Sequence, residues 1–486
     1  MANIQDLEPK GIWKNFYSLT RIPRPSGHLE KVQQFLLDWA KERNIEAFKD
    51  NAGNIIMRKP ASPGLENLTP VTMESHMDMV PQKATDSNHD FLTDPIETYI
   101  DGEWVKAKGT TLGSDDGIGD ATAMAVLEDD SLRHGPIEAI FTVDEETSMY
   151  GVSNLKPDTL QGKILLNLDN ETEGEMVIGS AGGEDIRPSM EYQEEDADPS
   201  LAAVEITLKG LKGGHSGLEI GLGRANANKL MARFLLDAVR KTDAKLAFWE
   251  GGNMRNAIPN NARAVLLVDK AQQEEITTLA ADWLLVFRAE QQGVEDDITL
   301  SAAPAGEVTK VVPDEIRDNL INAVMACPAG VSRMIPSAPE IVETSCNLGI
   351  VKIGGGRAEA DILVRSSCDS QLEALEDSIE SVFAMAGMSC EKAGRYGTWQ
   401  PNFASPIVKT VEKVYADLFG EKPRVQVVHA GLECSVIGET YPEMDMVSFG
   451  PTLRSPHTPF ERCNIPSVEK YWKFVKALLE AIPPMK

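Results

Sequence analysis

Three apolar runs in the first part of the chain each end at, or just before, acidic or imidazole side chains, and this pattern constrains the fold more than any other feature. The runs are PVTMESHM, PIEAIFTV and KILLNLD, and their length and their content of valine, isoleucine and leucine predict buried β-strands. Apolar residues at helical spacing lie in the same region, for example Val32, Leu36 and Trp39. Strands that alternate with helices predict an α/β architecture with a mostly parallel central sheet.

The middle of the chain follows a different pattern. The polar, acidic stretch EYQEEDADPS separates it from the first region. Residues 201–302 and 303–394 then repeat a similar order of predicted strands and helices, which indicates two tandem α+β units of the ferredoxin-like type. From residue 395 the α/β pattern returns. We therefore expect residues 1–185 and 395–486 to form one α/β domain, interrupted by an inserted α+β domain at residues 186–394.

The chain is strongly acidic, with 47 lysine and arginine residues, 75 aspartate and glutamate residues and a net charge of −28. Nucleic acids and anionic membrane surfaces require a cationic face, so neither is expected as a partner. No apolar run reaches the roughly 18 residues of a membrane span, and the N-terminus has no signal-peptide pattern. The six scattered cysteines contain no CxxC pair and are typical of reduced thiols. The sequence therefore predicts a cytoplasmic protein.

Imidazole and carboxylate side chains gather at the predicted strand ends. Because ligands of parallel α/β sheets bind at the carboxyl ends of the strands, we expect these side chains to converge. Taken singly, each has an ordinary alternative, such as a solvated strand end, a helix N-cap with an acidic first turn, or an exposed helix start. Their coincidence in one region favours a shared site. The candidates are His76, Asp78, Asp115, Asp116, Glu145, Glu146, Asp169 and His457.

So many carboxylates in one site repel each other unless a cation lies between them. Zinc and similar ions bind histidine nitrogen and carboxylate oxygen, and two such ions that share a bridging carboxylate can activate a water molecule. His76 and Asp78 point to the same face of a strand, so Asp78 can accept the second ring N–H of His76. Glu145 and Glu146 point to different sides of an extended chain, so one can bind metal while the other acts as general base.

The motifs ESHMDMV, TLGSDDGIG, VDEET, NLDNE and SPHTPFE, in this order, resemble those of the di-zinc exopeptidases. That family includes carboxypeptidases, acetylornithine deacetylase and succinyl-diaminopimelate desuccinylase. IPRPSGHLEKV, GGHSGLEI, NAIPNNARA and HAGLECSVI are similar to signatures of one branch, the aminoacyl-histidine dipeptidases, also called cytosol non-specific dipeptidases. The resemblance covers essentially the whole chain. It implies a zinc-exopeptidase-like catalytic domain with the inserted α+β domain as its lid.

The resemblance implies two zinc ions per chain, bridged by Asp115, with cobalt or manganese as alternatives. Each ion then takes one further histidine and one further carboxylate. The ligands so implied are His76 and Asp169 for one ion, and Glu146 and His457 for the other. Glu145 is then the general base, and Asp78 orients His76.

The resemblance also implies substrate-contacting residues in the lid. His215 and Asn256 match residues that stabilise the oxyanion, although their residue types alone suggest only a turn histidine and a strand-edge asparagine. Arg365 matches an arginine that binds the terminal carboxylate of the substrate, a role suited to a bidentate guanidinium. Gly431 is expected to line the substrate pocket.

The function expected from these residues is hydrolysis of Xaa-His and other unblocked dipeptides by a metal-dependent dipeptidase. Small dipeptides are then the substrates, and the resemblance implies a homodimer formed through the lid. Two alternatives stay open: an N-acyl amino acid deacylase or aminoacylase on the same scaffold, and a non-catalytic relative. The full set of ligand types and the base speak against the second alternative.

Overall fold

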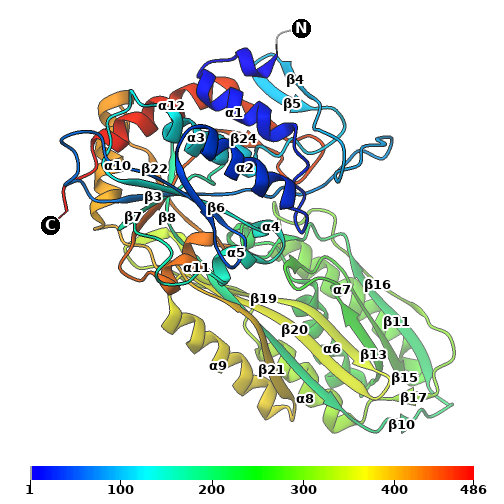
Figure 1. The fold of residues 1–486 in the computed structure, drawn as a ribbon. Coiled ribbons are helices and arrows are strands. Elements are labelled where there is room, and N and C mark those ends of the chain that lie inside the picture. Colours follow the sequence, from blue (N-terminus) through cyan, green and yellow to red (C-terminus); the bar gives the residue numbers. More distant parts are fainter. Residues whose placement is uncertain (1–2, 486) are drawn as a thin grey trace. The chain divides into compact units, whose positions relative to one another are not determined.

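The computed structural model describes residues 3–485, which form two compact units (Figure 1). The first unit contains the described residues up to Gly179, residues 399–427 and those from Leu432 onward. The second unit contains residues 180–398 and 428–431. Within the described range, no helix combines the length and the apolar character that crossing a membrane requires.

An eight-stranded sheet lies at the centre of the first unit (Figure 1). Its four central strands, β6, β3, β7 and β23, run parallel, whereas β1, β2 and β8 pair antiparallel with a neighbour. The sheet is thus mixed, with a parallel core. Every residue of β3, β6 and β7 is buried, as expected of strands that are covered on both faces. In spatial order the strands are β1 (Glu46–Lys49), β2 (Ile55–Lys59), β6 (Ile137–Thr142), β3 (Val71–His76), β7 (Ile164–Asn167), β23 (Asp445–Ser448), β8 (Glu175–Ser180) and β22 (Arg424–Val428).

Helix α3 (Ser114–Glu128) packs on β3 and carries mostly small and apolar side chains. It is buried from Ser114 to Leu127, a stretch that includes three aspartates, Asp115, Asp116 and Asp120. Helix α1 (Lys10–Thr20) packs against it so closely that a methyl group at Gly11 would lie 3.2 Å from the Cβ of Ala125. The other helices of this unit are α2 (Glu30–Glu42), α4 (Glu145–Ser148), α5 (Tyr150–Ser153), α10 (Pro406–Phe419), α11 (Glu433–Thr440) and α12 (Ile465–Glu480). A small sheet contains β24 (Leu453–Arg454), β25 (Arg462–Asn464), β5 (Trp104–Ala107) and β4 (Thr98–Asp101).

The second unit is built on a nine-stranded sheet in which every described pairing is antiparallel. Its strands, in spatial order, are β16 (Thr299–Pro304), β11 (Ala202–Lys209), β15 (Ala262–Val268), β13 (Lys245–Gly251), β19 (Ala338–Gly354), β20 (Arg357–Ser366), β9 (Gly182–Glu191) and β21 (Ser389–Tyr396), with β18 (Gly330–Ile335) paired to β19. Two short strands, β10 (Glu195–Asp196) and β17 (Lys310–Val311), pair separately. The helices are α6 (Ala227–Thr242), α7 (Gln273–Glu290), α8 (Asp314–Ala326) and α9 (Asp369–Met385).

Two groups of strands and helices meet in this sheet. The first group comprises β11, β13, β15 and β16 with α6 and α7, and the second comprises β9 and β18–β21 with α8 and α9. The pairing of β13 with β19 joins the two groups into one sheet, and β9, which precedes the first group in the chain, belongs to the second group. All four helices share one apolar core with the sheet, to which α6 contributes Phe234 and α9 contributes Phe383. Each such aromatic stabilises the unit by roughly 1.5–3 kcal/mol through burial alone.

The β19–β20 hairpin shows how local sequence sets this register. Gly354 pairs with Arg357, which leaves Gly355 and Gly356 as the connecting residues. Both have positive φ, at 64° and 77°, as a two-residue turn of the primed type requires. The GGG sequence therefore fixes the pairing along β20, the strand that carries Arg365.

Candidate functional site

The parallel core of the first sheet brings three of the predicted ligand segments to one edge. His76 is the last residue of β3, and β6 and β7 are its two neighbours in the sheet. Glu145 and Glu146 begin α4 shortly after β6 ends, and Asp169 follows the end of β7. The carboxyl ends of these strands thus gather an imidazole and three carboxylates, as expected for a parallel sheet.

Asp115 and His457 reach the same place from irregular backbone. Asp115 lies in the first turn of α3, where its φ and ψ are −84° and 108° and therefore not helical. His457 lies in the loop between β24 and β25 and has a φ of 58°, which non-glycine residues rarely adopt. Asp144, immediately before Glu145, also has a positive φ, of 55°. Such backbone is held in place only by its surroundings and is common at functional sites.

The side chains converge around Asp115. One of its carboxylate oxygens, Oδ1, lies 3.1 Å from His76 Nε2, and the other, Oδ2, lies 3.1 Å from His457 Nε2. His457 Nε2 is also 3.0 Å from Glu146 Oε2, and His76 Nε2 is 3.8 Å from Asp169 Oδ1. Asp115 is therefore placed between two pairs, each of one imidazole and one carboxylate. We call His76, Asp115, Glu145, Glu146, Asp169 and His457 the acidic cluster.

Asp78 holds the backbone at the start of α4. Its carboxylate accepts hydrogen bonds from the backbone N–H groups of Glu145 (3.1 Å) and Glu146 (3.3 Å) and from Ser26 Oγ (2.6 Å). His76 Nδ1 lies 3.3 Å from the Asp78 carbonyl oxygen and 3.5 Å from Oδ1, so its contact with the carboxylate is long for a hydrogen bond. Asp78 thus orients both glutamates and lies beside the ring of His76.

The pKa shifts in the acidic cluster arise from burial and from the contacts between its imidazoles and carboxylates. Burial, together with the nearby Glu146 and Asp115, raises the pKa of Glu145 to about 8. Burial also raises the pKa of Asp169 well above its ordinary value. Hydrogen bonds to Asp115 and Glu146 raise the pKa of His457 to about 11. The cluster therefore attracts positive charge strongly.

A divalent cation can supply that charge. Ligand atoms of His76, Asp115 and Glu146 lie within 4.8 Å of one another, which makes this group a possible metal site. Imidazole nitrogen with carboxylate oxygen is a donor set that suits zinc and related ions. The residues present fit a metal centre.

In the second unit, two short strands bring His215 and Asn256 close together. Strand β12 (Gly214–His215) pairs with β14 (Ala257–Ile258), and the Ser216 N–H donates to the Asn256 carbonyl oxygen (2.9 Å). His215 Nδ1 accepts hydrogen bonds from the backbone N–H groups of Gly217 (3.1 Å) and Leu218 (3.0 Å). Nδ1 is therefore an acceptor, which leaves the ring hydrogen on Nε2 as a donor.

Arg365 lies in the same part of the second unit as His215. A methyl group at Gly217 would lie 3.1 Å from His215 Cε1 and 3.2 Å from Arg365 Nε, so both side chains approach this glycine. Arg365 is buried and donates to the Tyr396 hydroxyl, while its Nε has no hydrogen-bond partner among residues 3–485. A buried donor without a partner is costly, and an anionic ligand would satisfy it.

His429 belongs to this group too. Its Nε2 lies 2.7 Å from Ser345 Oγ, and Ser345 is the partner of Arg365 in the β19–β20 pair. Burial, with the Arg365 guanidinium and His215 nearby, lowers the pKa of His429 to about 3, so the ring is neutral. Gly431 follows His429 closely and lies in the same unit.

Several of these residues cannot be identified as functional from the sequence. Tyr396 and Ser345 belong to ordinary strand patterns, so nothing in the sequence marks them. His429 lies in the HAGLEC motif, but its residue type does not reveal a role. Two buried charged residues of the first unit, Arg24 and Glu461, lie in motifs that mark the family resemblance, IPRPSG and SPHTPFE, yet neither has a periodic signal.

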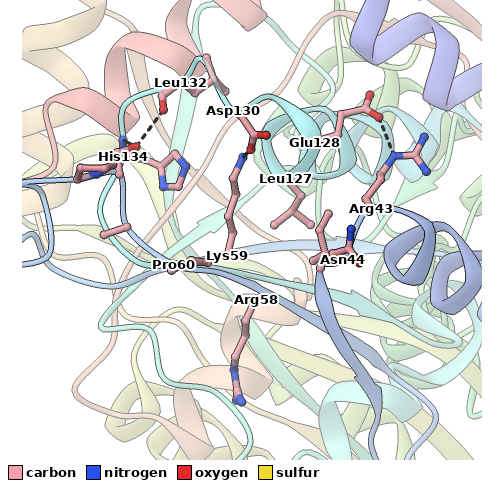
Figure 2. A pocket seen from close by; sticks show the side chains of 14 residues that line it. Arg43, Asn44, Arg58, Lys59, Pro60, Leu127, Glu128, Asp130, Leu132 and His134 are labelled. Atoms are coloured by element: carbon pink, nitrogen blue, oxygen red, sulfur yellow. Dashed lines mark hydrogen bonds and ion pairs between the residues drawn. The ribbon is translucent and has the colours of Figure 1, made fainter.

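Figure 2 shows a different pocket of the first unit, with a volume of about 440 Å³, that shares no residue with the acidic cluster. Its charged side chains are paired: Arg43 Nε lies 3.0 Å from Glu128 Oε2, and Lys59 Nζ lies 3.3 Å from Asp130 Oδ1. Lys59 also donates to backbone carbonyl oxygens at the C-terminal end of α3. Lys59 therefore stabilises that helix end, and the pocket gives no indication of a second functional site.

Comparisons with known proteins agree with this geometry. Cytosol non-specific dipeptidase from Escherichia coli (strain K12) is 41% identical to the chain over 483 residues, which are 99% of this chain and 100% of the relative. The crystal structure of aminoacylhistidine dipeptidase from Vibrio alginolyticus is 41% identical and has a TM-score of 0.95, with 100% of this chain and 99% of that chain covered.

A more distant structure shares the fold. Aminopeptidase PepT from Bacillus cereus ATCC 10987 is 16% identical, with a TM-score of 0.56 and coverage of 98% of this chain and 99% of that chain. The family model described as peptidase family M20/M25/M40 matches residues 72–481. These findings confirm the resemblance to the metal-dependent exopeptidases and the α/β fold it implies. The chain belongs to peptidase family M20/M25/M40.

Proposed function

We propose that this chain is a metal-dependent dipeptidase that hydrolyses Xaa-His and other dipeptides with free amino and carboxyl ends. The observation that carries the proposal is the acidic cluster in a chain 41% identical, over 483 residues, to a protein named as a dipeptidase. A relative with a solved structure is named as an aminoacylhistidine dipeptidase, which favours histidine as the second residue of the substrate.

The proposed cofactor is a pair of zinc ions, for which cobalt or manganese can substitute. His76 and Asp169 would hold one ion, Glu146 and His457 the other, and Asp115 would bridge the two. The distances of 3.1 Å from each oxygen of Asp115 to one imidazole support this division. When bound, the ions polarise the scissile carbonyl and make a water molecule more acidic.

Glu145 is the proposed general base. It would take a proton from the attacking water and deliver it to the leaving amine. Its carboxylate fits the role because no hydrogen bond from another side chain occupies it in the described structure, whereas its backbone N–H is held by Asp78. The rigid start of α4 then keeps the base in a fixed position.

The second unit supplies the proposed substrate contacts. His215, with its ring hydrogen on Nε2, would donate to the developing oxyanion, and Asn256 would assist it. Arg365 would bind the terminal carboxylate of the dipeptide, and Gly431 would line the pocket beside His429. We further propose a cytoplasmic location, as in the name of the Escherichia coli relative, and a homodimer formed through the second unit.

The proposal is tested by release of free histidine from Ala-His and from β-alanyl-histidine, with N-acetyl-histidine as the comparison substrate. Each reaction is run with purified protein as isolated, after chelation, and after zinc is restored. Hydrolysis of a dipeptide that is lost on chelation and recovered with zinc supports the proposal. Hydrolysis of N-acetyl-histidine alone would instead identify a deacylase on the same scaffold.

Glu145→Gln is expected to lower kcat for Ala-His by about 10²–10⁴-fold, because it removes the proton acceptor and keeps the shape of the side chain. The bound metal, measured by elemental analysis, should stay at the wild-type level. A variant that retains near-wild-type kcat would contradict the assignment of Glu145 as the base.

Arg365→Met is expected to raise KM for Ala-His by about 10–100-fold, since it removes a charge-assisted contact of roughly 1.5–3 kcal/mol. The matched measurement uses Ala-histidinamide, which lacks the terminal carboxylate. Wild-type protein should prefer the free acid, and the variant should lose most of this preference. An unchanged preference for the acid would show that another group binds the carboxylate.

Asp115→Asn is expected to weaken the binding of both metal ions, because one charged oxygen faces each imidazole. Metal content after dialysis against a weak chelator checks this, with Asp86→Asn as the control for an exposed aspartate. Loss of only one ion, with the other held as tightly as in wild type, would rule out a bridging role.

A further inference from the structure

Glu461 is a buried carboxylate that accepts hydrogen bonds from an entire loop. Backbone N–H groups of Leu112 (2.7 Å), Gly113 (3.0 Å), Ser114 (2.7 Å) and Asp115 (3.2 Å) all donate to it, and so does Ser114 Oγ (2.6 Å). The side chain is 2% exposed. Glu461 lies four residues after His457, so one carboxylate connects the segment of His457 to the loop of Asp115.

Arg24 holds the same loop from its carbonyl side. Its Nη1 donates to the carbonyl oxygens of Met77 (2.9 Å) and Asp78 (3.0 Å), and its Nη2 donates to the carbonyl oxygen of Gly113. The guanidinium is 1% exposed and forms no ion pair with any carboxylate in residues 3–485. It therefore connects the segment that follows His76 to the loop of Asp115.

Glycines make room for this arginine. A methyl group at Gly113 would lie 2.8 Å from Arg24 Nη2, and one at Gly117 would lie 2.4 Å from the same atom. Gly113 also has a φ of 69°, in the left-handed region. The close approach of the guanidinium to the loop thus depends on the sequence TLGSDDGIG on both sides of Asp115.

We infer that Arg24 and Glu461 are positioning residues that clamp the Leu112–Asp115 loop and so fix the spacing of His76, Asp115 and His457. These three side chains come from segments far apart in the sequence. The loop carries Asp115 and is connected by Arg24 to the segment of His76 and by Glu461 to the segment of His457. Apart from the Ser114 hydroxyl, the groups that Arg24 and Glu461 bind in the described residues belong to the backbone. The inference rests on the proposed function, because it requires the acidic cluster to bind metal.

If Glu461 only stabilised the fold, its replacement would lower the stability of the protein without changing its metal centre. Glu138 is a matched case: it is 4% exposed and its carboxylate accepts hydrogen bonds from the backbone N–H groups of Gln161 (2.6 Å) and Gly162 (2.7 Å). Glu138 lies near the amino-terminal end of β6, and its carboxylate forms no hydrogen bond with a residue of the acidic cluster in the described structure. Glu138→Gln and Glu461→Gln should therefore cost similar stability, and only Glu461→Gln should disturb the metal centre.

The test measures metal affinity and metal geometry in full-length protein. Zinc affinity is obtained by competition with a chromophoric chelator, and the visible absorption of the cobalt-substituted protein reports the coordination geometry. We expect Glu461→Gln to weaken the affinity for at least one ion by about 10–100-fold, as loss of groups that orient ligands typically does. Its cobalt spectrum should change, and kcat should fall while KM for Ala-His stays within about twofold of wild type.

Glu138→Gln should leave the affinity, the cobalt spectrum and kcat at wild-type values. Equal affinity and spectrum in Glu461→Gln and Glu138→Gln would overturn the clamp, even if Glu461→Gln lost stability. If Glu461→Gln yields no folded protein, Arg24→Lys carries the test, with Arg317→Lys in the second unit as its control. Lysine keeps the charge but cannot form the planar fork to three carbonyls, so an unchanged metal centre would again overturn the clamp.

The same measurements separate this inference from the proposed function. Wild-type protein that binds no metal and hydrolyses no dipeptide would refute both. Wild-type protein that binds metal, with a Glu461→Gln variant that binds it equally well and with the same spectrum, would refute the clamp alone.

Discussion

The repulsion among carboxylates at the carboxyl edge of the first sheet is the constraint on which the rest of the structure depends. Four carboxylates and two imidazoles lie in the acidic cluster, and most of them are shielded from water. Burying like charges without compensation is costly, because the low dielectric constant of the interior strengthens their repulsion. The fold must therefore hold these groups together against their own electrostatics. A cation between them compensates this repulsion, because each carboxylate is then attracted to the cation.

Backbone N–H groups supply the rigidity that the cluster needs in addition to a cation. Asp78 accepts from the first two residues of α4, and Glu461 accepts from the loop that enters α3. In both cases a carboxylate meets the free donors of a helix start, which offsets part of the cost of its burial. The pKa of Asp78 is lowered by His76 and by these hydrogen bonds, whereas burial still raises the pKa of Glu461. Both carboxylates set the direction of neighbouring ligand side chains. Positional precision in the site thus comes from groups that need not touch substrate.

How much the sequence predicts depends on whether a feature leaves a local trace. Strands β3, β6 and β7 are continuous apolar runs, and α6 and α12 have clear helical spacing, so these elements are predictable from residues alone. The pairing of β13 with β19 depends on contacts between distant segments and has no such trace. The convergence of His76, Glu146 and Asp169 follows from strand ends in a parallel sheet. His215 and Arg365 stand out only through the family resemblance, and nothing but the structure reveals Tyr396 or the donors that surround Glu461.

The charge of the chain bears on the choice between a dipeptide and an N-acyl amino acid as substrate. At a net charge of −28 the protein repels anions at long range, although salt screens this effect beyond about 8 Å at physiological ionic strength. An unblocked dipeptide is a zwitterion, so its ammonium group offsets the repulsion that its carboxylate meets. An N-acyl amino acid has lost that ammonium group and approaches as a net anion. In the proposed function, the buried guanidinium of Arg365, near a neutral His429, would hold one carboxylate at short range and would leave the long-range repulsion in place. The charge distribution therefore favours the dipeptide, most strongly at low ionic strength.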